Sequence, residues 1–213
     1  MNKIQNILLA SVLLFSGLIS NANAQLYFGG NIGLAMLKKA DITEGSETFE
    51  IGFKDDLVLA GLVGYSLNDN FRVEGEVAYQ ENDLKSLGMG GIEINADMIG
   101  DFRGETTNLS WLLNGYYDFT PNGNFRPYLT AGIGMSKVNI EFRLEDPSFG
   151  VIGAADNDST MTYHLGAGMG YMITDNITLD LRYRYLMLDD PTFDNASMDY
   201  ASHNITGGIR ISF

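Results

Sequence analysis

Cysteine is absent from this chain of 213 residues, and proline (4) and tryptophan (1) are scarce. Without cysteine there can be no disulfide, no thiolate metal site and no cysteine nucleophile. Basic residues are also few, because 13 Lys and Arg face 27 Asp and Glu, for a formal net charge of −14. Nucleic acid is bound by clustered positive charge, so the composition predicts no nucleic-acid partner.

No long hydrophobic run follows residue 24, so no later segment is a candidate membrane helix. Glycine, by contrast, is abundant: 25 of 213 residues, about 12% against a usual ~7%. Hydrophobic residues make up 45% of the chain and charged residues 19%, a balance too apolar for an unfolded protein in water. The length predicts one domain, or one barrel.

Residues 1–24 have the features of a secretory signal peptide. Lys3 supplies a positive start, and the 13 residues from Ile7 to Ile19 are mostly apolar. A short membrane anchor is the alternative, but a helix needs about 20 apolar residues to span a bilayer. Ala22 and Ala24 form the small-x-small pattern that signal peptidase accepts, so we predict cleavage after Ala24 and a mature domain over residues 25–213.

The rest of the chain alternates apolar and polar residues with period two, the pattern of strands that have one apolar face. Ile177, Leu179 and Leu181, for example, each have polar neighbours. Helical spacing explains none of the segments, and the glycine-rich ones would be poor helices. In the fifth segment the apolar residues change parity near Ser136, which predicts a β-bulge or a strand leaving the sheet. The eight segments are 26–36, 57–67, 71–80, 105–119, 125–142, 160–172, 176–188 and 200–213.

The connections between the segments alternate between tight turns and four long loops, at 38–56, 81–104, 143–159 and 189–199. An even number of strands with short turns at one end and long loops at the other is typical of a bacterial outer-membrane barrel. A soluble lipocalin-type barrel also has eight strands and also alternates. Period two alone does not decide which face points outward.

Aromatic and charged residues favour the membrane. The long loops contain 19 of the 27 acidic residues, so the segments themselves are nearly neutral. Aromatic residues gather at both ends of the segments, as in the interfacial girdles of membrane barrels. We therefore predict an all-β, eight-stranded antiparallel up-and-down transmembrane β-barrel. The aromatic residues are Phe28, Tyr65, Phe71, Tyr117, Phe119, Phe125, Tyr171 and Phe213 at the turn end, and Tyr79, Trp111, Phe142 and Tyr163 at the loop end.

The last segment alternates apolar residues and stops at an aromatic residue, with Gly208, Ile209, Ile211 and Phe213 as its defining positions. This ending resembles the signal that the barrel-assembly machinery of Gram-negative bacteria reads. The mature chain is similar to small outer-membrane barrels of the opacity-protein and OmpX-like type, the outer membrane protein beta-barrel domain family. The resemblance implies assembly by that machinery, an outer-membrane location, contact with outer-membrane lipid and lipopolysaccharide, and a structural or adhesive role.

If the apolar parity faces lipid, nine charged residues face the lumen. Eight strands enclose a space that side chains can fill, and buried charges need partners, so we expect an ion-pair network across it. A permanent polar plug is one interpretation, and a gated narrow channel for ions or small solutes is the other. The nine residues are Arg72, Glu74, Glu76, Asp118, Arg126, Asp180, Arg182, Arg184 and Arg210.

The two histidines do not form an evident catalytic or metal site. A lipid-modifying enzyme would need a histidine beside a nucleophile on the lipid-facing wall, but Ser202 has the opposite parity to His203. His164 has luminal parity and lies on a segment that does not neighbour that of His203. We predict no enzyme, no cofactor and no metal site, with His203 at the membrane interface and His164 hydrogen-bonded in the lumen.

The loops are where a surface function would lie. Loop 81–104 contains an apolar, glycine-rich run from Leu87 to Ile92, which predicts a flexible contact site for a host or envelope partner, or a segment folded over the barrel mouth. The acidic residues of the last loop lack the spacing of a dedicated calcium loop, so a solvated rim is an alternative to cation binding. They are Asp189, Asp190, Asp194 and Asp199.

Overall fold

The structure of the protein is a computed structural model that describes residues 25–38, 40–44, 47–89, 92–95, 101–119, 123–146, 150–189, 192–193, 196–198 and 200–213. The predicted signal peptide, with its cleavage signal at Ala22 and Ala24, lies outside the described residues. Across the described ranges, no helix is long and apolar enough to cross a membrane.

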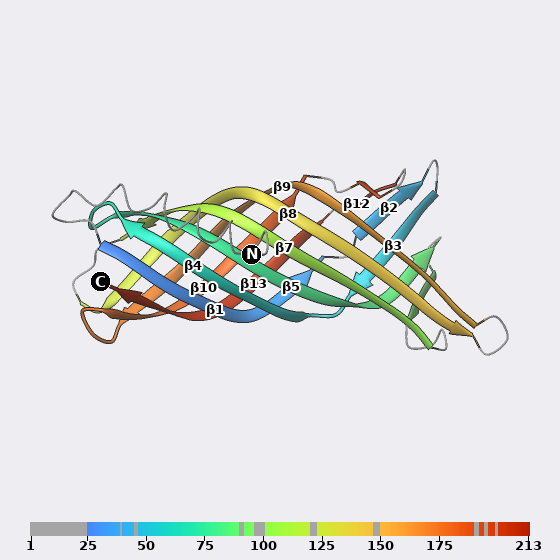
Figure 1. The fold of residues 1–213 in the computed structure, drawn as a ribbon, viewed down its shortest axis with the longest axis horizontal. Coiled ribbons are helices and arrows are strands. Elements are labelled where there is room, and N and C mark those ends of the chain that lie inside the picture. The colour runs from blue at the N-terminus through green and yellow to red at the C-terminus, as the bar shows by residue number, and fades with distance from the viewer. Residues whose placement is uncertain are drawn as a thin grey trace, which may run out of the picture.

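Eight strands close into an antiparallel barrel (Figure 1), which confirms the predicted fold class. Each strand pairs with the next around the wall, and the last strand pairs back to the first. In order around the wall they are β1 (Gln25–Leu37), β4 (Asp56–Ser66), β5 (Phe71–Met89), β7 (Asp101–Asp118), β8 (Phe125–Asp146), β9 (Gly150–Met172), β10 (Ile177–Leu188) and β13 (Ala201–Ser212).

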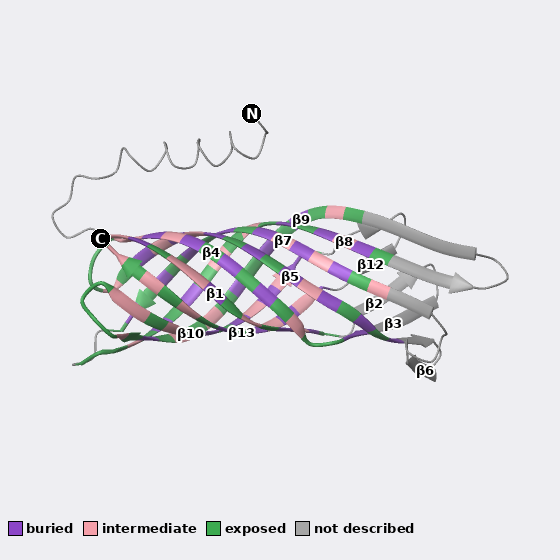
Figure 2. Ribbon diagram, turned by 60° about the horizontal axis from the view of Figure 1, so that its bottom comes forward, coloured by how far each residue is buried: buried purple, intermediate pink, exposed green. Residues whose placement is uncertain are grey.

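The outward face of the barrel is apolar and the inward face is polar. Ile32, Leu113 and Leu165 leave 57%, 63% and 62% of their surface exposed, whereas Glu74 and Arg184 are each 2% exposed. Along the coloured parts of the barrel strands in Figure 2, buried residues alternate in large part with exposed or half-buried ones. A soluble barrel would bury its apolar face, because a band of exposed apolar residues is stable only against lipid or a partner. The lipocalin-type alternative is therefore excluded.

The strands extend well beyond the predicted segments, because the expected long loops are in large part paired strands. The hairpin of β8 and β9 stays in register as far as Asp146 and Gly150. Outside the lipid no face has to be apolar, so the alternation fades while backbone pairing continues. The predicted loop boundaries were wrong for this reason. The additional short strands are β2 (Ala40–Glu44), β3 (Glu47–Phe53), β6 (Ile92–Asn95), β11 (Thr192–Phe193) and β12 (Ala196–Met198).

The predicted bulge near Ser136 is also wrong. Ser136 pairs with Ser110 on one side and Thr160 on the other, and neither register shifts there. The apolar residues change parity because the lumen itself becomes apolar at this height, where Val138 and Ile140 are 0% and 7% exposed and face inward. The register shift that the structure does show lies between Gly52 and Phe53, where β3 meets β5.

Aromatic rings line the outside of the barrel at its turn end, as the sequence predicts. Phe28 packs edge-on against Phe213, with ring centroids 5.9 Å apart, and Phe71 packs against Tyr117 at 5.2 Å. The backbone N–H of Phe213 donates to the carbonyl oxygen of Leu26. The terminal aromatic residue thus helps to close the seam between β1 and β13. Ile211, Ile209 and Gly208 pair across the same seam with β1.

Candidate functional site

The turn-end half of the lumen is filled by charged side chains from facing strands. Arg72 on β5 donates from Nε to Oδ2 of Asp118 on β7 at 2.7 Å, and its guanidinium stacks 3.8 Å from the centroid of the Tyr116 ring. Tyr27 on β1 accepts a hydrogen bond from Arg72 and donates one to Oε2 of Glu74 at 3.1 Å. Tyr27, from β1, therefore bridges Arg72 and Glu74, which are neighbours on the inward face of β5.

Glu76 is the centre of this arrangement, because two arginines converge on its carboxylate. Arg182 donates from Nη1 to Oε2 at 2.8 Å, and Arg184 donates from Nη1 to Oε1 at 2.5 Å. Arg182 also donates to Oη of Tyr116 at 2.9 Å, and that hydroxyl donates to Oε1 of Glu74 at 2.6 Å. All of these side chains are buried, so the charges are compensated by one another rather than by water.

A second pair completes the layer nearest the turn end. Arg210 on β13 lies 2.9 Å from Asp180 on β10, and Tyr128 donates a hydrogen bond to the other oxygen of Asp180. Arg126 is only half-buried, and none of the ion pairs among the described residues includes it. Eight of the nine predicted residues thus meet in the lumen. We call them the luminal network: Arg72, Glu74, Glu76, Asp118, Asp180, Arg182, Arg184 and Arg210.

Four arginines and four carboxylates make the luminal network neutral. Sequence reasoning missed the three tyrosines that connect these charges, Tyr27, Tyr116 and Tyr128, each no more than 4% exposed. Their parity was the available signal, since Tyr116 lies two residues from Asp118 on the same face of β7. Tyrosine is also typical of the membrane interface, so the residue type alone does not indicate a luminal position.

Above the luminal network lies a collar of uncharged polar side chains. Nε2 of His164 is 2.8 Å from Oδ1 of Asn114, so His164 is a hydrogen-bonded lumen residue, as expected. Ser136 hydrogen-bonds Ser110 at 2.7 Å and accepts from Thr162 at 2.6 Å. These side chains belong to three neighbouring strands, β7, β8 and β9.

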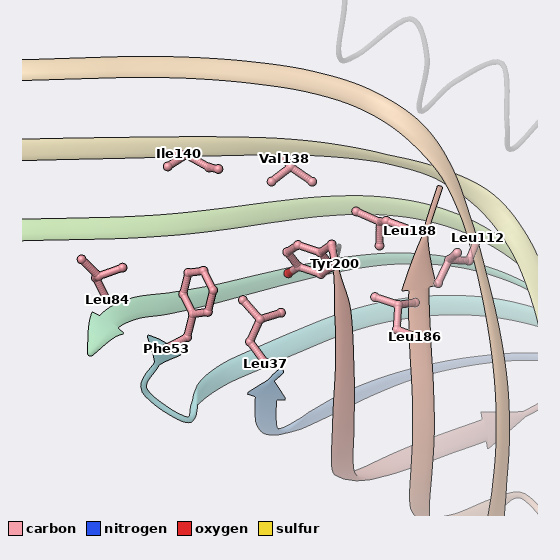
Figure 3. Packing of buried hydrophobic residues seen from close by; sticks show 9 residues of the cluster. All are labelled: Leu37, Phe53, Leu84, Leu112, Val138, Ile140, Leu186, Leu188 and Tyr200. Atoms are coloured by element: carbon pink, nitrogen blue, oxygen red, sulfur yellow. The ribbon is translucent and has the colours of Figure 1, made fainter. Parts of the chain in front are cut away.

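The loop-end part of the lumen is closed by apolar side chains, which we call the outer plug (Figure 3). They come from strands all around the wall and point toward one another across the interior. At the inner boundary of the plug, Oη of Tyr200 accepts a hydrogen bond from Gln80 at 3.1 Å. The outer plug consists of Leu37, Phe53, Leu84, Leu112, Val138, Ile140, Leu186, Leu188 and Tyr200.

The second histidine lies on the outside of the barrel near the loop end. Nδ1 of His203 is 2.7 Å from Oη of Tyr183, and its ring lies tilted against that of Tyr185. Ser202 faces the lumen and is fully buried, so it does not approach the histidine ring as a nucleophile would. No group of three potential metal ligands occurs among the described residues. The acidic residues Asp190, Asp194 and Asp199 lie outside them.

The sequence matches the family described as the outer membrane protein beta-barrel domain over residues 7–213. It is 29% identical to the outer membrane protein PagN of Salmonella typhimurium, with 71% of this chain and 70% of PagN covered. It is 26% identical to a putative adhesin of Rickettsia felis, with 70% of each chain covered. Among solved structures, Neisserial surface protein A (NspA) superposes with a TM-score of 0.54 and 16% identity, covering 90% of this chain and 99% of that one.

Proposed function

Because the chain belongs to the outer membrane protein beta-barrel domain family, an outer-membrane family with adhesive or structural members, we propose that it is a surface adhesin. In this proposal the barrel anchors the protein in the outer membrane, and the strand extensions beyond the lipid form the binding surface. Short turns face the periplasm and long connections face the exterior in such barrels. One of the relatives is named as a putative adhesin, which supports an adhesive role over a purely structural one.

The observation that carries the proposal is the continuation of the wall past the apolar band, over a closed interior. The outer plug fills the space between the extended strands with buried apolar side chains. A platform that is already ordered loses less conformational entropy when a partner binds. The strand extensions are therefore suited to present a fixed surface rather than a set of unstructured loops.

The apolar run of loop 81–104 is part of this platform. The expectation of a flexible loop is wrong for the described residues of this run, because they belong to paired strands. Leu87 pairs with Ile51 and Ile94, and Met89 pairs with Phe49 and Ile92. Apolar residues thus occupy adjacent register positions on three strands, β3, β5 and β6. We propose this sheet as the contact region. The excess of acidic residues in the external connections favours a host partner with a basic surface.

The proposal predicts that the β5–β6 hairpin is needed for adherence. The protein is displayed on bacteria of a non-adherent strain, which should then adhere to cultured epithelial cells. Replacing residues 87–94 by a two-residue Asn-Gly turn, which joins Ser86 to Asn95, should reduce adherence at least several-fold. That turn type suits the pair because Ser86 and Asn95 are cross-strand partners. Adherent bacteria are counted after washing, at two salt concentrations.

The control is the same Asn-Gly replacement at residues 68–69, in the turn at the opposite end of the barrel. It should leave adherence unchanged, and flow cytometry should show equal amounts of all variants at the surface. Adherence of the unaltered protein no greater than that of the empty strain would overturn the adhesin proposal and leave the structural role.

The channel interpretation makes a separate prediction. The luminal network and the outer plug both lie across the lumen in the described part of the chain. An eight-stranded barrel holds side chains rather than a water-filled pore. We therefore expect no discrete conductance steps from the folded protein in a planar bilayer in which a large porin conducts. Steps that change on Arg182→Gln would favour a channel.

A further inference from the structure

Four side chains form a continuous cluster on the outer surface of the barrel. They lie at the edge of the apolar band that is nearer the loop end. Lys38 follows β1, Tyr183 and Tyr185 belong to β10, and His203 belongs to β13, which lies between them. Nearer the turn end on the same three strands, the outward residues Leu34, Ile205 and Leu181 are 57%, 46% and 55% exposed. The cluster therefore lies where the apolar band of this wall ends.

The cluster is held together by contacts between its members. Nζ of Lys38 donates to Oη of Tyr185 at 3.0 Å and lies 4.7 Å from the centroid of its ring. His203 lies against the same ring, with centroids 4.8 Å apart, and its Nδ1 is 2.7 Å from Oη of Tyr183. The ammonium group has three donors, and the hydrogen bond to Tyr185 occupies one of them. Lys38 is exposed on the outer surface of the barrel.

The opposite wall has the reverse charge at a comparable height. Asp83, Glu105 and Glu141 are direct cross-strand partners on β5, β7 and β8, and all three are exposed. These three carboxylates give this side of the barrel a charge character unlike that of the side with the cluster.

We infer that the cluster of Lys38, Tyr183, Tyr185 and His203 binds a phosphate group of an outer-leaflet glycolipid, the phosphorylated glucosamine headgroup of lipopolysaccharide. Lysine at the end of an apolar band extends its charge to the headgroup level, where tyrosine also prefers to lie. The ammonium and imidazole groups supply donors to phosphate oxygens, and the exposed part of Tyr183 supplies a surface for the sugar ring. The site depends on the outer-membrane location and not on the adhesive role.

The test measures retention of fluorescently labelled lipid A by the folded full-length barrel in detergent micelles. Lys38→Gln is expected to weaken binding about fivefold, the range of a single partly exposed charge pair, and Lys38→Gln with His203→Gln about tenfold. Lys38→Arg should retain most of the affinity. The matched control is Lys137→Gln, because Lys137 is an exposed, outward lysine on β8 at the far wall.

Two further measurements identify the ligand group. Lipid A without its phosphates should bind as weakly to the unaltered protein as intact lipid A binds to the double variant. Inorganic phosphate at matched ionic strength should compete only poorly. Equal losses for Lys38→Gln and Lys137→Gln would overturn the site, equal retention of the two lipids would overturn the phosphate, and full displacement by inorganic phosphate would overturn the lipid as its source. Unboiled gel migration shows that each variant is folded.

Discussion

Glu76→Gln should lower the free energy of unfolding by about 3–5 kcal/mol, the usual effect of removing one partner from a buried ion pair. Glu76 is the one carboxylate in the luminal network that contacts both Arg182 and Arg184. Arg182 keeps a second acid within 3.8 Å, Glu74, whereas none of the ion pairs among the described residues gives Arg184 another. The variant therefore leaves the Arg184 guanidinium, 2% exposed, without a counter-charge.

Unfolding is measured in urea with the barrel folded in lipid vesicles. The single tryptophan, Trp111, reports on the transition, because it lies on the lipid-facing surface and is 46% exposed. The control is Glu105→Gln, the same chemical change at an exposed outward position, which should alter stability by less than about 0.5 kcal/mol. An equal effect of the two substitutions would contradict the role assigned to Glu76.

Glu76→Gln combined with Arg184→Met gives a second measure of the same contact. If the two side chains stabilise each other, the double variant loses less stability than the two single losses together, by about 0.5–3 kcal/mol. Additive losses would mean that each residue acts through other neighbours.

Gly64→Val is expected to destabilise the barrel by about 1–3 kcal/mol, because the lumen has no room for a side chain at this position. A Cβ atom on Gly64 would fall on the phenol ring of Tyr27, which is 2% exposed. Tyr27 has little freedom to move, since it hydrogen-bonds Arg72 and Glu74. Displacing its ring would also disturb the ion pairs on that side of the luminal network.

The same strand provides the control. Gly61 faces outward, and a Cβ atom there would have nothing within 4 Å, so Gly61→Val should leave stability nearly unchanged. In a Tyr27→Ala background the cost of Gly64→Val should almost vanish, because the overlapping ring is gone. A cost that persists in that background would show that the backbone of β4, and not the luminal tyrosine, requires glycine.

Glu76 and Gly64 differ in how much of their role can be predicted from the sequence. Glu76 could be assigned to the lumen from the sequence, since Val77 and its outward neighbours define the opposite face of β5. Its partners could not be assigned, because Arg184 lies 108 positions away and reaches it across the interior. Gly64 gave no signal at all, because its necessity comes from a tyrosine on a neighbouring strand.

The sequence by itself determined the number of membrane strands, their polarity and the residues on each face. Those properties are local, since side chains alternate along every strand and lipid requires the outward ones to be apolar. The tertiary structure decided which luminal charges meet, how far the strands continue beyond the lipid, and that the loop end is closed by the outer plug. These three features depend on the register between strands that are distant in the chain. The alternation of residues along a single strand contains no information about that register.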